Sequence, residues 1–285
     1  MTTAPEISAI ELEDGRLIAW EQHGPPTGRP VLFFHGTPSY RRAIRPDRAM
    51  LDATAVRIIA IDRPGYGLST FKPGRRLIDW PTDVSRIADH LGLGSFGVIG
   101  HSGGGPHALA CARFIGDRIT VTTTVGGFCP FDSTASAAAS QRLGQLAARV
   151  PFAIEAMFTV GFAARDRFPV QSLQAVSRAI APADRTVLTG PDTAAQYMTR
   201  SSPTAAKAAA QDMAMFVRDW GFALSDIAGP VHLWHGTADA NVPYGHSVYA
   251  QSIIPDSTLH TVEGGGHLLL GEHLGEMLRL MSATG

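Results

Sequence analysis

The chain has 285 residues, enough to bury a substantial core, and its 45% hydrophobic and 17% charged residues exclude an intrinsically disordered protein. Its 24 Lys and Arg residues nearly cancel its 25 Asp and Glu residues, so it lacks the positive charge that would neutralise the phosphates of a nucleic acid. We therefore expect a small-molecule substrate as the partner and no nucleic acid.

Strand and helix patterns alternate along the chain. Residues 7–12 and 16–21 flank the turn pair Asp14-Gly15 and predict an opening hairpin. Further strand-like runs lie at residues 31–34, 57–61, 96–99, 120–125, 231–234 and 258–262. The first three of these are nearly continuous and apolar, which is typical of strands buried on both faces. Residues 80–91 repeat apolar side chains at helical spacing. These patterns predict an α/β fold.

About a hundred residues separate the sixth predicted strand from the seventh, far more than a single crossover helix needs. The stretch is rich in alanine and in helix-compatible apolar residues and lacks clear strand runs. We predict that residues 127–220 form a helical cap over the carboxyl ends of the strands, where α/β sheets bind ligands. Residues 1–126 and 221–285 then form the core.

The pattern G-x-S-x-G occurs at residues 100–104, Gly-His-Ser-Gly-Gly, between the apolar run 96–99 and the helix-like run 106–112. A nucleophile on such a tight turn has a strained backbone, and the residues two before and two after it must be small. Both of these positions hold glycine. A plain glycine turn is the alternative, but this context predicts that Ser102 is a nucleophile whose exposed hydroxyl lies near the positive end of a helix.

A serine hydroxyl needs a base within hydrogen-bonding reach and a third group that orients the base. Among eleven histidines, His267 stands out because it lies in a glycine-rich loop after the last predicted strand, although a helix-capping role is the alternative. Asp239 follows the preceding strand and completes the chain order Ser, Asp, His, although aspartate is also common as a turn residue. Asp132, after the strand at 120–125, is the alternative position for the acid.

An oxyanion needs backbone N–H donors, and residues 34–38, Phe-His-Gly-Thr-Pro, follow a predicted strand where such a loop is expected. We predict that the amides of Thr37 and Gly103 supply these donors and that His35 supports its own loop. Residues 62–69 are glycine-rich but lack the lysine and the spacing of a phosphate-binding loop, so we interpret them as a structural turn.

The chain is expected to need no metal and no cofactor, since His232 and His235 share no acidic or cysteine partner at ligand spacing and lie on a predicted buried strand. Large apolar side chains in the cap predict an apolar substrate pocket, with ordinary helix packing as the alternative for each. These residues are Phe152, Met157, Phe158, Phe162 and Trp220.

Five segments, in this order, resemble the α/β-hydrolase superfamily, in its capped branch of small esterases, proline iminopeptidases, carbon-carbon bond hydrolases and cofactor-free perhydrolases. They are residues 35–38, 62–69, 100–104, 235–243 and 266–267. The resemblance implies a mostly parallel eight-stranded sheet flanked by helices, with an inserted helical cap. Because Ser102 stands where epoxide hydrolases and haloalkane dehalogenases carry an aspartate, those two activities are disfavoured.

Two cysteines, Cys111 and Cys129, suggest free thiols in a reducing compartment rather than a disulfide framework. No basic run followed by an apolar stretch opens the chain, and no segment approaches the roughly 18 apolar residues that span a bilayer. We therefore expect a cytoplasmic protein that has no membrane partner. A homodimer is an alternative that the sequence leaves open.

Together these features predict a serine hydrolase that cleaves an ester bond of a small, largely apolar substrate through an acyl-enzyme on Ser102. A carbon-carbon bond hydrolase and an aminopeptidase of the same fold are the alternatives, although an aminopeptidase needs acidic cap residues and Glu155 and Asp166 are too few. A small-molecule receptor or slow-hydrolase sensor is an alternative of another class, because a fold does not determine a function.

Overall fold

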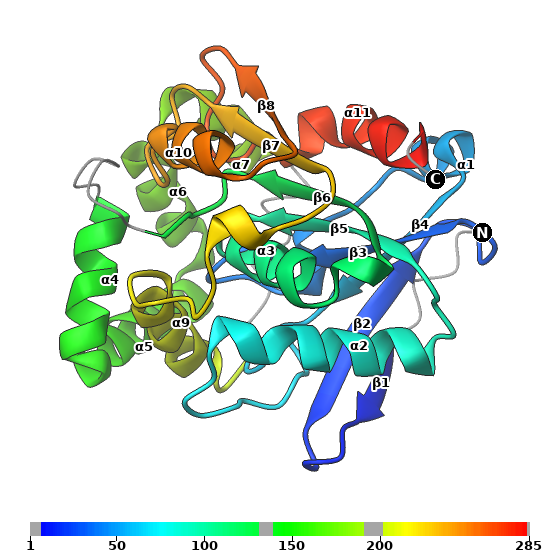
Figure 1. Ribbon diagram of the computed structural model, residues 1–285. Coiled ribbons are helices and arrows are strands. Elements are labelled where there is room, and N and C mark those ends of the chain that lie inside the picture. The colour runs from blue at the N-terminus through cyan, green and yellow to red at the C-terminus, as the bar shows by residue number, and fades with distance from the viewer. Residues whose placement is uncertain (1–6, 131–138, 191–201, 284–285) are drawn as a thin grey trace.

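An eight-stranded sheet forms the centre of the computed structural model, which describes residues 7–130, 139–190 and 202–283 (Figure 1). The strands are β1 (Ile7–Glu11), β2 (Leu17–His23), β3 (Arg29–Phe34), β4 (Val56–Ile61), β5 (Phe96–His101), β6 (Ile119–Val125), β7 (Val231–Gly236) and β8 (Ser257–Val262). Their order is β1-β2-β4-β3-β5-β6-β7-β8, and only the β1–β2 and β2–β4 pairs among them are antiparallel. The predicted mostly parallel, eight-stranded sheet is confirmed.

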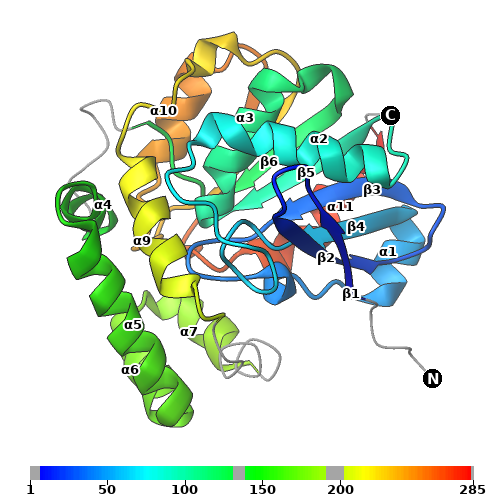
Figure 2. The ribbon, with the colours of Figure 1, turned by 90° about the horizontal axis from the view of Figure 1, so that it is seen from below.

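Helices cover both faces of the sheet, which explains why the central strands are apolar almost without interruption. Val31 and Phe33 of β3 pack with α1 and α11 on one face, whereas Leu32 and Phe34 pack with α2 and α3 on the other (Figures 1 and 2). In the described part of the chain, five helices belong to the core. They are α1 (Arg48–Thr54), α2 (Trp80–His90), α3 (Gly105–Phe114), α10 (Gly245–Ile253) and α11 (Leu270–Ala283). Short 3-10 turns occur at Arg41–Ala43, Leu77–Asp79, Ser102–Gly104, Gly116–Arg118 and Leu224–Asp226.

The described residues between β6 and β7 form helices and no strand, as expected for the inserted segment. These cap helices are α4 (Ala139–Arg149), α5 (Pro151–Arg167), α6 (Pro169–Ala179), α7 (Pro182–Thr189) and α9 (Ala205–Phe216). Three of them begin with proline, which suits the first helical position because its missing N–H would have no partner there. The exact boundaries of a cap at 127 and 220 stay a prediction.

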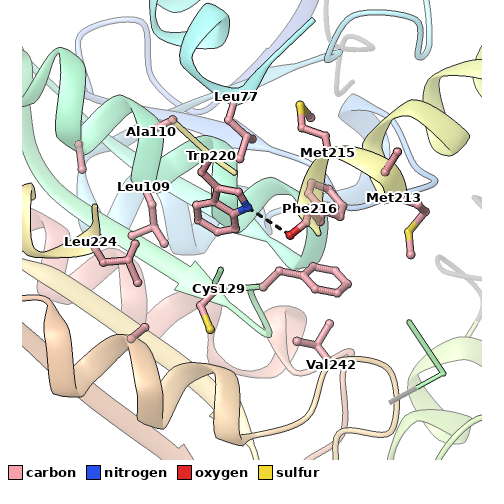
Figure 3. Packing of buried hydrophobic residues seen from close by; sticks show 14 of the residues in the cluster. Leu77, Leu109, Ala110, Cys129, Met213, Met215, Phe216, Trp220, Leu224 and Val242 are labelled. Carbon is pink, nitrogen blue, oxygen red and sulfur yellow. Dashed lines mark hydrogen bonds between the residues drawn. The ribbon is translucent and has the colours of Figure 1, made fainter. Parts of the chain in front are cut away.

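Helix α9 joins the cap helices to the core. Most of its residues are buried, while α4 and α5 pack on its outer side and stand apart from the sheet (Figure 2). Its last residue, Phe216, enters a core cluster together with Leu109 of α3 and Trp220 (Figure 3). No helix in the described residues is long and apolar enough to cross a bilayer.

Candidate active site

Ser102 occupies the turn between β5 and α3, and its φ of 52° is a conformation that residues with a side chain rarely adopt. A Cβ atom at Gly100 would overlap the carbonyl oxygen of Gly104, and one at Gly104 would overlap the carbonyl oxygen of Phe34. The turn therefore closes only with glycine at the two positions that the sequence pattern singled out.

Ser102 as a whole residue is only 7% exposed, and the expected exposure of its hydroxyl stays a prediction. Two neighbouring segments cover it. Gly36 approaches so closely that a Cβ there would lie 3.1 Å from the Ser102 Cβ, and a Cβ at Gly103 would lie 2.9 Å from the ring of Phe216. The turn is thus covered by the loop after β3 and by α9.

His267 and Asp239 form a buried hydrogen-bonded pair, with 2.7 Å between His267 Nδ1 and Asp239 Oδ2. Asp239 lies in the loop after β7 and His267 in the loop after β8. The other carboxylate oxygen of Asp239 accepts the backbone N–H groups of Asn241 and Val242 at 2.8 and 2.9 Å, which fixes its orientation. Because the carboxylate requires a proton on Nδ1, Nε2 of His267 is left as the basic nitrogen.

The two partners of this pair shift each other's pKa. Burial alone would lower the pKa of His267, but the charge and the hydrogen bond of Asp239, helped by Asp184, raise it above its ordinary value. Burial would raise the pKa of Asp239, but His267 and His235 outweigh burial and hold that pKa well below its ordinary value. Asp239 is therefore ionised and stabilises a protonated imidazole.

His235 contacts Asp239, an interaction that was not predicted from the sequence. Its Nε2–H faces Asp239 Oδ2 at 3.2 Å and the Val242 carbonyl oxygen at 2.8 Å, while Nδ1 accepts a hydrogen bond from Ser247 Oγ at 2.7 Å. His232 instead contacts His260, with 2.9 Å between ring nitrogens. His235 thus helps to hold the carboxylate that orients His267.

The residue before Ser102 connects the turn to the His267 loop. His101 Nε2–H donates to the His267 carbonyl oxygen at 3.2 Å, and burial together with His267 lowers the pKa of His101 to about 4. Ser102 and the His267–Asp239 pair therefore lie at the same edge of the sheet, at the carboxyl ends of the strands. The Ser102 hydroxyl makes no hydrogen bond to any described residue, so its bond to the imidazole stays a prediction. Asp132, the alternative acid, lies outside the described residues.

The two predicted oxyanion residues lie side by side, because a Cβ at Gly103 would overlap the Thr37 hydroxyl. His35 supports this loop as expected, since it is fully buried and its Nδ1–H donates to the Gly36 carbonyl oxygen at 2.8 Å. Its Nε2 accepts the backbone N–H of Arg63 at 3.0 Å. The loop after β3 is therefore held by buried contacts, and the donor role of the two amides stays a prediction.

A buried charge network beneath this loop was not predicted. Asp212 on α9 is fully buried and accepts hydrogen bonds from Thr37 Oγ1 at 2.6 Å, Tyr66 OH at 2.8 Å and Arg63 Nη1 at 2.6 Å, as well as from Arg75. Burial would raise the pKa of Asp212, but the two guanidinium groups hold it well below its ordinary value. The segment 62–69, interpreted as a structural turn, thus also supplies a side chain, Arg63, that contacts the loop after β3.

Removing the Asp212 carboxylate is expected to destabilise the protein strongly. Asp212→Ala leaves Arg63 and Arg75 buried without their counter-charge, which costs about 3–5 kcal/mol of unfolding free energy. Urea denaturation measures the loss, with Lys207→Ala on the exposed side of the same helix as the control, expected within about 0.5 kcal/mol of wild type. A loss below about 1 kcal/mol for Asp212→Ala would contradict the network's importance.

The five apolar residues predicted to line the pocket have different environments. Trp220 is packed in the core, where its indole N–H donates to the Phe216 carbonyl oxygen at 3.2 Å (Figure 3). Phe158 and Phe162 are half-buried and contact each other, with 5.8 Å between ring centroids. Met157 is 46% exposed. Core packing explains Trp220, which lies after the end of α9, whereas a pocket role for Met157, Phe158 and Phe162 stays a prediction.

Phe152 fits neither alternative, pocket or helix packing, because it is 73% exposed on α5. The aromatic side chains beside the Ser102 turn are instead Phe216, which lies against Gly103, and Phe128, which stacks on Phe216 with 5.0 Å between ring centroids. Neither was singled out from the sequence, where a phenylalanine near the end of an alanine-rich helix looks like any core residue.

Comparison with known proteins agrees with this architecture. The family model described as the alpha/beta hydrolase fold matches residues 29–274. The proline iminopeptidase of Arabidopsis thaliana is 32% identical over 114 residues, 39% of this chain and 30% of that protein. A non-heme haloperoxidase of Rhodococcus erythropolis is 31% identical over 123 residues, 42% of this chain and 44% of that protein. The chain thus matches less than half the length of either relative.

Among solved structures, the esterase RhEst1 from Rhodococcus sp. ECU1013 has a TM-score of 0.69 at 20% sequence identity, over 96% of this chain and 97% of that one. At that identity the likeness shows a shared fold. The family model, by contrast, matches most of the chain and includes the Ser102 turn, the Asp239 loop and His267. The chain therefore belongs to the α/β-hydrolase fold family.

Proposed function

We propose that the chain is a serine hydrolase that cleaves an ester bond of a small, largely apolar substrate through an acyl-enzyme on Ser102. The observation that carries this proposal is the 2.7 Å hydrogen bond between His267 and Asp239 at the strand ends where Ser102 is held at positive φ. A serine, an aspartate and a histidine in this chain order form the triad that activates a serine hydroxyl.

In the proposed reaction, Ser102 Oγ attacks the carbonyl carbon of the ester while His267 Nε2 takes the hydroxyl proton. The amides of Thr37 and Gly103 donate to the resulting oxyanion. His267 then protonates the leaving alcohol, and the acyl group remains bound to Ser102. Water, deprotonated by His267, then attacks the acyl carbon; the bond to Ser102 Oγ breaks, His267 returns the proton to that oxygen, and the acid leaves. Asp239 stays ionised throughout and stabilises the imidazolium.

The buried network beneath the oxyanion loop supports chemistry in which negative charge develops there. Arg63 and Arg75 face the single carboxylate of Asp212, so the net charge of these three side chains is one positive charge. Arg63 Nη2 donates to the Thr37 hydroxyl at 2.8 Å and to the Gly36 carbonyl oxygen at 2.9 Å. A fixed positive charge behind the amides favours an oxyanion, because little water lies between them to screen it.

The surroundings of the turn favour an apolar group on the substrate. Phe216 and Phe128 present stacked aromatic rings beside Gly103, and apolar lining with few polar groups is typical of small-molecule pockets. A second candidate is an aminopeptidase, because proline iminopeptidases are among the relatives. Two cap carboxylates are already engaged, however: Asp166 contacts Arg165 at 3.1 Å, and Asp184 binds backbone amides. This favours the esterase.

A substrate panel tests the proposal. We expect p-nitrophenyl esters of short and medium acyl chains to be hydrolysed with higher kcat/KM than proline p-nitroanilide or a vinylogous diketone, and a fluorophosphonate to label wild type but not Ser102→Ala. Faster cleavage of the anilide would establish the aminopeptidase, and faster cleavage of the diketone the carbon-carbon bond hydrolase. Labelling of Ser102 without turnover of any substrate would favour the receptor or slow-hydrolase sensor.

A further inference from the structure

The His267 loop is bound by a carboxylate that comes from the cap helices. Asp184, in the first turn of α7, accepts the backbone N–H of His267 at 3.0 Å on one oxygen and the N–H of Leu268 at 2.7 Å on the other. The residue is only 3% exposed, and 83 residues separate it from His267 along the chain. A buried carboxylate that binds two successive amides fixes the local backbone, because leaving those donors without an acceptor is costly.

The loop is shaped to admit this carboxylate. A Cβ atom at Gly266 would overlap the Asp184 carboxylate group. Gly266 is not among the glycines with positive φ, so its backbone conformation is open to other residues. Space for Asp184, rather than backbone freedom, is therefore what requires glycine immediately before His267.

Three elements besides its own loop hold His267, each at a different group. Asp184 binds the backbone N–H, His101 donates to the carbonyl oxygen, and Asp239 accepts from Nδ1. His235 reaches the imidazole only through Asp239. The contacts from β5 and from the loop after β7 belong to the core, whereas the contact to the N–H comes from α7.

We propose that Asp184 is a positioning residue for His267, so that docking of α7 on the core is part of assembling the catalytic base. The inference rests on the proposed function, in which His267 is that base. It gives the cap helices a part in the chemistry beyond covering the substrate.

The charge of Asp184 gives this role a signature in the pH dependence. Burial lowers the pKa of His267, and Asp239 and then Asp184 raise it. Catalysis needs neutral His267, so kcat/KM falls as the pH drops through this pKa. Removing the negative charge at position 184 lowers the pKa and moves the acid limb to lower pH. A variant that only disturbed packing would lower kcat/KM without shifting the acid limb of its pH profile.

The experiment compares Asp184→Asn with Asp166→Asn, which removes the same charge from an exposed site on α5. For Asp184→Asn we expect kcat/KM to fall roughly ten- to a hundredfold, mainly in kcat, with the acid limb at lower pH. The amide offers one acceptor and sets its NH₂ group against the second backbone N–H. Asp166→Asn is expected to keep the wild-type kcat/KM and the wild-type position of the acid limb.

A second variant tests the contact while keeping the carboxylate. Gly266→Ala is expected to displace Asp184 and to lower kcat/KM about as much as Asp184→Ala. In the double variant Gly266→Ala/Asp184→Ala the added methyl group has nothing to displace. The fall in kcat/KM of the double variant is therefore expected to match that of Asp184→Ala alone. Losses that simply add would overturn the inference.

Failure of this inference is distinguishable from failure of the proposed function. In a Ser102→Ala background, NMR titration of the His267 imidazole measures its pKa without any turnover, and Asp184→Asn is expected to lower it there too. An unchanged titration with kcat within about twofold of wild type overturns the role of Asp184 and leaves Ser102 as nucleophile. Undiminished hydrolysis by Ser102→Ala overturns the proposed function instead.

Discussion

Replacing Ser102 with alanine is expected to lower kcat for ester hydrolysis by on the order of four to six decades, because the acyl-enzyme cannot form. Steady-state assays on a p-nitrophenyl ester measure the loss. Ser252→Ala, at an exposed serine on α10, is the matched control and is expected to keep full activity. Residual hydrolysis within about tenfold of wild type would mean that another group attacks the ester.

The strained backbone at Ser102 makes a second variant informative. Ser102→Gly is expected to be as inactive as Ser102→Ala, yet more stable, because glycine adopts a φ of 52° without the strain of a Cβ. The difference in unfolding free energy is on the order of 1 kcal/mol. Thermal denaturation of both proteins thus separates the loss of the hydroxyl from any loss of folding.

Replacing Asp239 with asparagine is expected to lower kcat by about four decades. The NH₂ group of asparagine favours the His267 tautomer with its proton on Nε2, where the base must accept the proton from Ser102. The carboxylate also raises the pKa of His267, so the remaining activity is expected to have its acid limb at lower pH. Stopped assays across the acid limb measure both effects, with Asp226→Asn, an exposed aspartate paired to Arg113, as the control.

The Asp239 prediction has two further outcomes. Because members of a triad act as a unit, Ser102→Ala/Asp239→Asn is expected to be no slower than Ser102→Ala alone. Activity of Asp239→Asn close to wild type would mean that the orienting acid lies elsewhere. Asp132→Asn would then be the variant to make, since that residue is the alternative on the preceding strand's loop.

Local patterns predicted the sheet well because each strand's burial follows from the chain itself. The run 57–61 has no polar side chain after its first residue, and such a run is typical of a strand that is buried on both faces. Gly100 and Gly104 likewise indicated the turn, because the steric demand they meet arises within a few residues of Ser102. Such constraints act between near neighbours, where a sequence shows both partners.

The surroundings of the site were less predictable because their partners are distant along the chain. Asp212 is 175 residues from Thr37, and its only signal is one acidic residue on the buried face of an alanine-rich helix. Asp184 resembled any first-turn aspartate of a helix, a position favoured by the helix dipole. The contact between His235 and Asp239 depends on how the loop after β7 folds back, which residue spacing does not reveal.

The sequence by itself determined the order of the strands along the chain, the glycine-lined turn at Ser102 and the candidates for base and acid, because periodicity and steric demand are local properties. Only the tertiary structure decided that Asp239 and His267 form a hydrogen bond, that Arg63 and Asp212 hold the loop after β3, and that Asp184 binds the His267 backbone. Each of these contacts satisfies a buried charge or donor, and burial is created only when distant segments pack together.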